Sequence, residues 1–246
     1  KADVSSFAER LYTTCLGRDS EEAGKDYWAS ELKSGKTGAE VAEGFFFSPE
    51  FEKRNLSPEE YIGSLYETFM GRTPADEEVA YWASEMKNGQ DRKAIFDGFV
   101  NSPEWADICL SYGIKSGTDV KPSITVTPSE EVKGFAERLY TTCLGRNSEE
   151  EGLEYWSKEI ANLKVSGSEA AKGFFFSEEM QKSKISDEEF LTRLYMTLMG
   201  REPDKAGFDY WLGEIKAGRM TLENVFDGFA ASNEWVDICA EAGILR

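Results

Sequence analysis

The sequence predicts an all-α protein with two homologous helical domains, each built from two copies of a helical repeat of about 54 residues. Three observations lead to this prediction. The stretch 7–18 recurs letter for letter at 135–146. Looser versions of the same stretch end in Met-Gly-Arg at Arg72 and Arg201. Apolar residues recur at helical spacing, and no segment shows the alternation that is typical of a strand.

Each repeat is expected to contain four helices. Polar capping residues mark the helix starts in the first repeat, and these are Ser5 or Ser6, Ser20, Thr37 and Ser48. Thr37 opens a capping box, and Ser48 is followed by a proline at the first helical position. The first helix should end at Gly17 and the second at Gly35, because glycine readily adopts the left-handed conformation that closes a helix.

The second repeat follows the same order, and so does the second copy. The helices of the second repeat are expected to open at Ser57, Thr73, Asp91 and Ser102. Between the two copies lies a stretch rich in Pro, Thr and Ser without helical spacing, which should be extended. We therefore divide the chain into a first helical domain (1–116), a linker (117–129) and a second helical domain (130–246).

The chain is strongly acidic. It carries 46 Asp and Glu against 28 Lys and Arg, which gives a formal net charge of −18. Nucleic acids and anionic membranes are bound through Lys and Arg that neutralise negative charge, so nucleic acid is not an expected partner. No apolar run reaches the length of a transmembrane helix, and direct membrane insertion is not expected either.

The chain has four cysteines, two in each duplicated half. Cys15 and Cys143 end the first helix of each copy, while Cys109 and Cys239 lie near the end of each copy. This arrangement favours the disulfides Cys15–Cys109 and Cys143–Cys239, which would each add about 4 kcal/mol in the chain-entropy model and would persist only outside a reducing cytosol. The alternative is four buried free thiols, because these positions also suit a helical core.

An arginine follows the glycine that ends the first helix of every repeat, and a glutamate follows thirteen residues later. An arginine fork can bind a carboxylate through two hydrogen bonds. We therefore expect four structural ion pairs, which are Arg18 with Glu31, Arg72 with Glu85, Arg146 with Glu159 and Arg201 with Glu214. The alternative is that these arginines face outward and bind an anionic ligand.

A Tyr-Trp pair occurs on the second helix of every repeat and is the candidate ligand-binding feature. The residues are Tyr27, Trp28, Tyr81, Trp82, Tyr155, Trp156, Tyr210 and Trp211. Flat aromatic faces can stack on sugar rings. Neighbours on a helix point about 100° apart, so one member of each pair should lie in the core and the other at its edge, with its polar end in water.

Other patterns carry no expected chemistry. The motif Gly-Phe-x-x-Ser-x-Glu begins at Gly44, Gly98, Gly173 and Gly228. Its glycine is expected to allow close helix packing, its phenylalanine to lie in the core, and its serine to cap the next helix. The segment after Asn147 resembles the start of a calcium loop, but Lys158 stands where that loop needs a glutamate, so no metal site is expected. The chain has no histidine, which excludes Ser-His and Cys-His catalysis and most zinc sites. The sequence predicts no cofactor and no enzymatic activity.

Taken together, the Leu-Gly-Arg, Tyr-Trp and Phe-x-x-Ser-x-Glu motifs resemble a bacterial domain of unknown function. That domain recurs in tandem in secreted, cell-surface and S-layer-like proteins and is distantly similar to the phycobilisome linker domain. The loop 201–207 fits the common family pattern, whereas the loops after Arg18 and Arg146 lack its proline. The resemblance implies a secreted or bacterial cell-surface location, no catalytic residues, and membership of a larger multidomain protein.

Two functions are consistent with these features. The first is a non-enzymatic extracellular binding or adhesion module that recognises glycan or another host or cell-wall ligand, including a surface protein, at equivalent sites in both copies. Two weak sites on one chain would then gain avidity. The alternative is a structural spacer or protein–protein assembly module with no ligand of its own.

Overall fold

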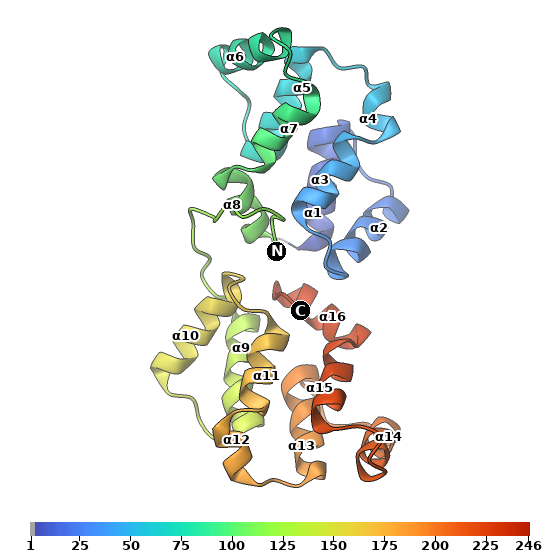
Figure 1. The fold of residues 1–246 in the computed structure, drawn as a ribbon, viewed down its shortest axis with the longest axis vertical. Coiled ribbons are helices and arrows are strands. Elements are labelled where there is room, and N and C mark those ends of the chain that lie inside the picture. Colours follow the sequence, from blue (N-terminus) through green and yellow to red (C-terminus); the bar gives the residue numbers. More distant parts are fainter. Residues whose placement is uncertain (1–2) are drawn as a thin grey trace. The chain divides into compact units, whose positions relative to one another are not determined.

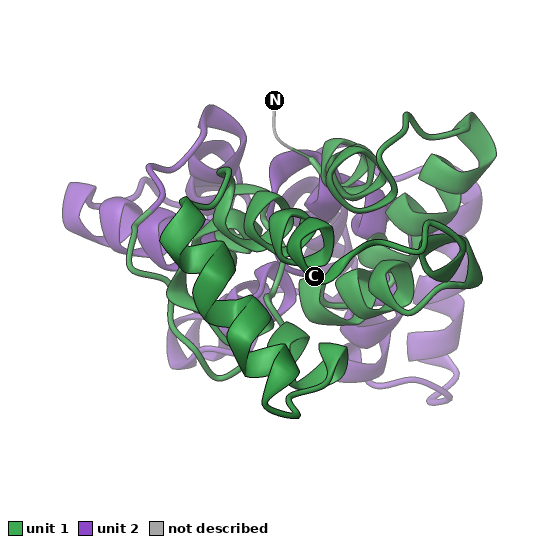
Figure 2. Ribbon diagram, turned by 90° about the horizontal axis from the view of Figure 1, so that it is seen from above, with its two compact units in different colours: residues 1–125 green, residues 126–246 purple. Residues whose placement is uncertain are grey.

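The computed structural model describes residues 3–246 (Figure 1). Throughout this part of the chain every regular element is helical, which confirms the all-α class. The chain divides into two compact units between Thr125 and Val126, inside the segment that the sequence predicts as a linker (Figure 2). The two units are called unit 1 and unit 2, and each is described by itself.

Unit 1 contains two repeats with the same order of elements, in which the first helix runs into a π-helical turn and three α-helices follow. The first repeat comprises α1 (Val4–Leu11), η1 (Tyr12–Leu16), α2 (Glu22–Lys33), α3 (Gly38–Phe46) and α4 (Pro49–Lys53). The second comprises α5 (Pro58–Leu65), η2 (Tyr66–Met70), α6 (Asp76–Lys87), α7 (Arg92–Val100) and α8 (Pro103–Ser111).

Unit 2 repeats this plan. Its first repeat comprises α9 (Glu130–Arg138), η3 (Leu139–Leu144), α10 (Glu150–Ala161), α11 (Gly167–Phe175) and α12 (Glu178–Ser183). Its second comprises α13 (Asp187–Leu194), η4 (Tyr195–Met199), α14 (Lys205–Lys216), α15 (Leu222–Ala230) and α16 (Asn233–Ala242).

Local sequence sets most helix starts. The hydroxyls of Thr37 and Ser48 accept hydrogen bonds from the backbone N–H three residues on, as predicted, and each such cap contributes about 1 kcal/mol. The prediction for α1 is wrong by two or three residues, because Asp3 caps this helix by accepting from the N–H of Ser6 at 2.8 Å. Ser20 does not cap α2 but hydrogen-bonds Glu9, and α2 begins at Glu22.

The π-helical turns were not predicted. Each one ends at a glycine with φ between 65° and 70°, at Gly17, Gly71, Gly145 and Gly200. A π-helical turn disturbs the regular hydrogen bonding of a helix, so its carbonyls accept from other donors. Arg10 donates to the carbonyls of Glu67 (3.0 Å) and Thr68 (2.9 Å) in η2, and Arg138 donates to that of Thr197 (3.1 Å) in η4. The first helix of one repeat thus completes the π-helical turn of the other.

Two threonine pairs join the repeats inside the units. Thr68, which is fully buried, donates to the hydroxyl of Thr14 at 2.9 Å in unit 1. Thr142 and the equally buried Thr197 form the matching pair at 2.6 Å in unit 2. The two repeats of a unit therefore share one interior.

Aromatic side chains fill that interior. The indole of Trp105 is fully buried, with its ring centroid 4.7 Å from that of Phe69 and 5.7 Å from that of Phe7. Trp235 takes the same place against Phe135 in unit 2, at 5.4 Å. The last helix of each unit is thereby packed onto the first by rings that bury large apolar areas.

The predicted disulfides are wrong, because all four cysteines are buried free thiols. The two members of a predicted pair have different charged neighbours: Cys15 lies near Arg54 and Glu50, whereas Cys109 lies near Arg10. Burial raises the pKa of every one of these thiols, to about 12 for Cys143. The alternative from the sequence, four apolar core positions, is the one that the structure adopts.

The segment between the units is extended but anchored. Asp107 on α8 accepts hydrogen bonds from the backbone N–H groups of Ser123 (2.6 Å) and Ile124 (3.1 Å). Val126 exchanges two hydrogen bonds with the side chain of Asn162, at 2.7 and 3.0 Å. Much of the segment 117–129 is therefore held on one unit or the other.

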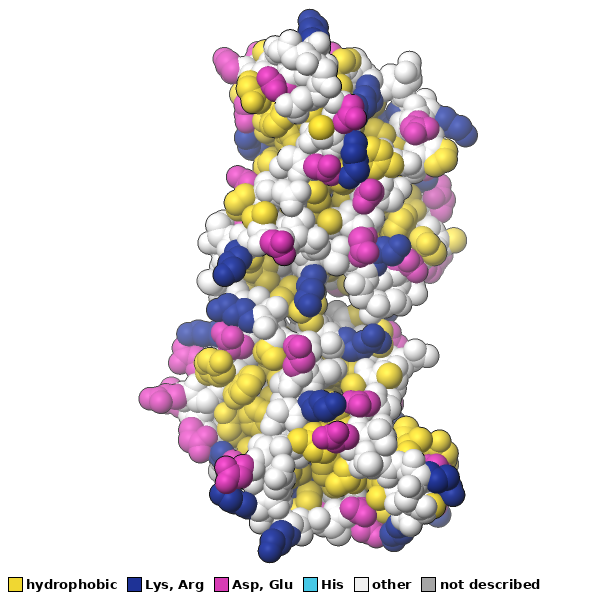
Figure 3. Space-filling model, viewed as in Figure 1, with side chains coloured by type: hydrophobic (Ala, Val, Ile, Leu, Met, Phe, Trp, Pro, Cys, Tyr) yellow, Lys and Arg dark blue, Asp and Glu magenta, His cyan; other side chains and the backbone are white. Residues whose placement is uncertain are grey.

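Charged side chains are scattered over the surface among uncharged ones (Figure 3). On the face drawn in Figure 3, Asp and Glu are interspersed with Lys and Arg on both units. Within residues 3–246 no helix combines the length and the apolar character that crossing a membrane requires.

Candidate functional site

The Tyr-Trp pairs separate as the helical geometry predicts. The four tyrosines are 54–57% exposed, and the four tryptophans are partly buried and packed against the cores. Each tryptophan contacts the phenylalanine of the Gly-Phe-x-x-Ser-x-Glu motif on the next helix, with centroids 5.0 to 5.5 Å apart. The tyrosine ring stands edge-on to its tryptophan at 5.1 to 5.3 Å. The tryptophan therefore fixes the tyrosine on the surface.

The motif glycine makes room for the tryptophan in two repeats. A Cβ on Gly44 or Gly228 would lie 2.7 Å from Cη2 of Trp28 or Trp211. The packing is looser at Gly98, where a Cβ would lie 3.9 Å from Cη2 of Trp82. No atom lies within 4 Å of a Cβ placed at Gly173. The expectation of close helix packing at this glycine thus holds for the first and last repeats.

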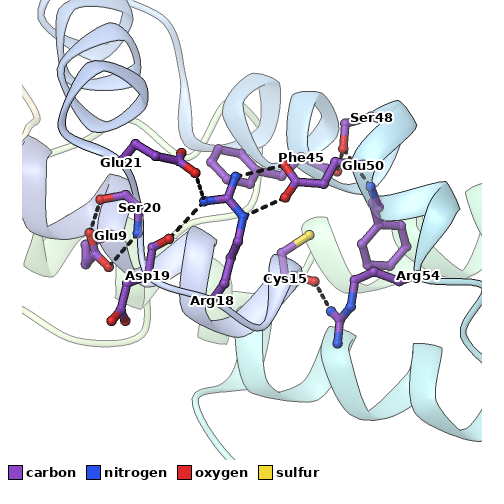
Figure 4. A network of polar contacts seen from close by, with 11 residues as sticks. Glu9, Cys15, Arg18, Asp19, Ser20, Glu21, Phe45, Ser48, Glu50 and Arg54 are labelled. Atoms are coloured by element: carbon purple, nitrogen blue, oxygen red, sulfur yellow. Dashed lines mark hydrogen bonds and ion pairs between the residues drawn. The ribbon is translucent and has the colours of Figure 1, made fainter.

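The predicted arginine–glutamate pairs (Arg18–Glu31, Arg72–Glu85, Arg146–Glu159 and Arg201–Glu214) are wrong, because each arginine binds other carboxylates. Arg18 donates to Glu50 at 2.6 and 3.0 Å and to Glu21 at 2.8 Å (Figure 4). Arg146 and Arg201 bind the equivalent glutamates, Glu179 and Glu234.

Arg72 differs from the other three and forms a two-bond pair with Glu78, at 2.8 Å for each bond. In every repeat the guanidinium also lies 5.0 to 5.3 Å from the ring centroid of a tyrosine in the π-helical turn, which is Tyr12, Tyr66, Tyr140 or Tyr195. These arginines are engaged by the protein itself, which argues against the alternative of an anion site at this position.

Distance along the helix explains the error. Glu31 lies on the last turn of α2, about 13 Å along the axis from its first residue, whereas Arg18 precedes the helix. In the first, third and fourth repeats, the last residue of the Gly-Phe-x-x-Ser-x-Glu motif is a carboxylate that reaches the arginine. This glutamate follows the arginine by 32 or 33 residues in these repeats, so the recurring motif was a signal in the sequence for the correct partner.

The four predicted glutamates lie instead beside the exposed tyrosines, where a helix-ending motif holds them. In the first repeat the N–H of Gly35 donates to the carbonyl of Leu32 (3.1 Å), and that of Lys36 donates to the carbonyl of Glu31 (3.0 Å). This is a Schellman motif, which places the side chains of Glu31 and Lys36 next to each other. Their charged atoms are 3.0 Å apart.

The same motif closes the second helix of the other three repeats. Gln90 donates to Glu85 at 2.8 Å, Lys164 lies 3.4 Å from Glu159, and Arg219 donates to Glu214 through two nitrogens. Glycine has the positive φ that the motif requires in three repeats, whereas Leu163 has it in the third, at 56°.

We call each of these surfaces a tyrosine patch. A patch consists of the exposed tyrosine, the glutamate four residues on, and the residue five positions after that glutamate. The four patches are Tyr27/Glu31/Lys36, Tyr81/Glu85/Gln90, Tyr155/Glu159/Lys164 and Tyr210/Glu214/Arg219. Residues four apart on a helix are surface neighbours, so the carboxylate lies beside the ring.

In the first and fourth patches the ion pair favours the charged form of a side chain. The hydrogen bond with Glu31 raises the pKa of Lys36, and Arg219 lowers the pKa of Glu214. The glutamate side chains are only 17–32% exposed where they pair with Lys or Arg, while the tyrosine beside them is more than half exposed. A patch therefore presents a flat ring next to fixed hydrogen-bond acceptors and donors.

The described residues contain no candidate metal centre. Among residues 3–246, no three His, Cys, Asp or Glu side chains come close enough to hold a metal ion. The acidic segment after Asn147 serves the fold, because Glu149 binds Arg146 at 2.7 Å just before α10.

Sequence comparison identifies the repeat. The family model for a domain of unknown function, DUF4214, matches residues 1–55, 42–109, 129–184 and 171–239. The chain belongs to the DUF4214 family. Each DUF4214 match covers most or all of one repeat, and the matches within a unit overlap from α3 to α4 in unit 1 and from α11 to α12 in unit 2. No curated protein sequence matches the chain.

Proposed function

We propose that this DUF4214 chain is a non-enzymatic carbohydrate-binding module of a secreted or surface-displayed bacterial protein, and that the tyrosine patches are its contact sites. One observation carries the proposal. All four repeats fix a half-exposed tyrosine beside a glutamate and, in three repeats, a Lys or Arg paired with it. A sugar ring has an apolar C–H face that can pack on the tyrosine and hydroxyls that can bind the charged groups.

The electrostatics favour binding over catalysis. Glycoside hydrolysis by paired carboxylates needs one acid whose pKa is raised so that it can donate a proton. The pKa values of the Glu50, Glu78 and Glu214 carboxyl groups are lowered, mainly by hydrogen bonds from Arg18, Arg72 and Arg219. Such carboxylates accept hydrogen bonds and are poor general acids.

Repetition would compensate for a shallow site. A single exposed ring with one ion pair would bind a sugar weakly, but several patches on one chain can engage a polymer at once. A long glycan or a glycan-coated surface is therefore the expected ligand, and a monosaccharide should bind poorly.

A glycan array tests this proposal. The intact chain should give reproducible hits, which a variant with Ala at Tyr27, Tyr81, Tyr155 and Tyr210 should lose. The matched control is Phe47→Ala, which removes an exposed aromatic ring (39% exposed) outside the patches and should keep the hits. A blank array together with self-association in light scattering would instead favour an assembly module without a glycan ligand.

A further inference from the structure

A cleft in unit 2 lies between α9 and α10, two helices that pack against each other (Figure 1). Its lining comes from Pro128, from Lys133 on α9 and from residues between Glu150 and Lys158 on α10. Its volume is about 330 Å³, which falls within the usual range for small-molecule sites. Because Glu150 and Lys158 are eight residues apart, the cleft follows about 12 Å of the axis of α10.

The floor of the cleft carries a hydroxyl without a partner. Ser157 is the buried residue of the lining, at 3% exposed, and its Oγ makes no hydrogen bond to any group in residues 3–246. A buried polar group left unpaired costs stability. The other three repeats avoid this cost, because Ala29, Ala83 and Leu212 stand at the equivalent position directly after the tryptophan. Only the third repeat therefore places a polar group at this point.

Two partly buried apolar residues form the walls. One is Leu153 on α10, where unit 1 has Lys25. The other is Pro128, whose neighbours are held on both sides: Val126 is hydrogen-bonded to the residue that follows α10, and Ser129 caps α9. The walls are therefore fixed by contacts within unit 2.

Charged side chains form the exposed rim. Lys158 binds Glu154 at 2.5 Å. Glu150 forms no ion pair within residues 3–246, so its oxygens can accept hydrogen bonds from a guest. Two lysines and two glutamates contribute to the lining, which is neutral as a whole and suits an uncharged guest.

We propose that this cleft binds a neutral disaccharide unit of a glycan. The apolar C–H faces of the sugar rings lie against Leu153 and Pro128, and sugar hydroxyls bond Glu150 at the rim. The hydroxyl of Ser157 turns about its Cα–Cβ bond and pairs with a sugar hydroxyl at the floor. This inference rests on the proposed carbohydrate-binding function and adds a second kind of site to the tyrosine patches.

A peptide suits the cleft less well than a sugar. Peptides that bind in extended form pair with unsatisfied backbone groups at the edge of a sheet. The walls of this cleft are helices, in which the backbone groups are already hydrogen-bonded to one another. Recognition must therefore come from side chains, as it does for sugar hydroxyls.

NMR titration of the intact chain tests the proposal. The probes are cellobiose, maltose, lactose and N,N′-diacetylchitobiose, and the reporters are the backbone amide signals of Leu153 and Ser157. At least one of these disaccharides should shift both signals at millimolar concentration. No shift with any of the four overturns the proposal.

Three variants assign the binding to the cleft. Ser157→Ala should weaken binding about two- to tenfold, the range for one hydrogen bond, and should not lower the urea midpoint, because Ala29 already takes this place in unit 1. Leu153→Lys introduces the residue of unit 1 and should abolish binding. Ser30→Ala, the same substitution at an exposed serine of α2, is the control and should change nothing. Unchanged affinity in both cleft variants refutes the site.

The cleft and the tyrosine patches can fail separately. Array hits that depend on the four tyrosines, together with no response at Ser157, refute the cleft alone. Disaccharide shifts at Ser157, together with array hits that survive the loss of the tyrosines, refute the patches alone.

Discussion

Replacing Gly38 by alanine should destabilise unit 1, although alanine is the better helix former. An added Cβ would lie 2.5 Å from Sγ of Cys109, 3.2 Å from Cζ2 of Trp105 and 3.5 Å from Cζ of Phe7. All three side chains are fully buried, so they have little space into which to move. Overpacking of this kind costs about 1–3 kcal/mol.

Gly63→Ala is the matched control, because the substitution adds the same methyl group to a helix of the same unit. Nothing lies within 4 Å of a Cβ at Gly63, which is in the interior of α5. This variant should therefore gain about 0.5–1 kcal/mol from the lower entropy of the unfolded chain and better helix propensity. The two variants should move the stability of unit 1 in opposite directions.

Urea unfolding of the intact chain, followed by NMR, measures both effects. The indole N–H signal of Trp105 reports unit 1 and that of Trp235 reports unit 2. Gly38→Ala should lower the midpoint for Trp105 and leave that for Trp235 unchanged. Adding Cys109→Ala should recover part of the loss, with a coupling of about 0.5–3 kcal/mol. A Gly38→Ala protein as stable as the parent, or no coupling with Cys109, would refute the packing described here.

Three further outcomes can be measured. Ala39→Ser should stabilise unit 1 by about 1 kcal/mol in urea unfolding, because the buried indole N–H of Trp105 has no acceptor, whereas that of Trp235 donates to Ser168 at 2.8 Å. Iodoacetamide should leave the native chain unlabelled and add four labels in denaturant without reductant, and fewer labels would restore the disulfide hypothesis. The pKa of Glu78 is lowered from 4.5 to about 2, mainly by Arg72, so its contribution to stability is present above pH 4.5 and is lost as the pH falls towards 2. The urea midpoint of the Glu78→Gln variant should therefore depend less on pH between pH 4.5 and 2 than that of the parent. The same pH dependence in both proteins would contradict this.

The sequence contained much of the fold because helix starts and stops are local. Thr37 with Glu40 forms the predicted capping box, and Gly17 has the predicted left-handed conformation. Such signals involve residues three or four apart and need no knowledge of the tertiary structure. The π-helical turns escaped prediction because they depend on arginines and threonines from another repeat, as Arg10 and Thr68 show.

The residues of the tyrosine patches were singled out from the sequence, but which of them lie next to one another was not predicted. The angle between neighbours on a helix predicts that Tyr27 and Trp28 face different ways, and the structure shows that Tyr27 is the exposed one and Trp28 packs against the core. Glu31 was chosen correctly as a recurring residue and given the wrong partner. Its partner Lys36 could have been found, because Gly35 already marked the end of the helix and a Schellman motif joins the residues on either side of it.

The sequence by itself determined the helical class, the fourfold repeat, the helix boundaries within a few residues and the separation of each Tyr-Trp pair into an inner and an outer ring, since each depends on neighbours along the chain. Only the tertiary structure decided which carboxylate meets Arg18, whether the cysteines pair, and which arginine donates to the carbonyl of Cys15 in unit 1 and of Cys143 in unit 2. These outcomes depend on side chains that are distant in sequence. Their positions are set by how the helices pack, and repeat spacing alone does not contain that information.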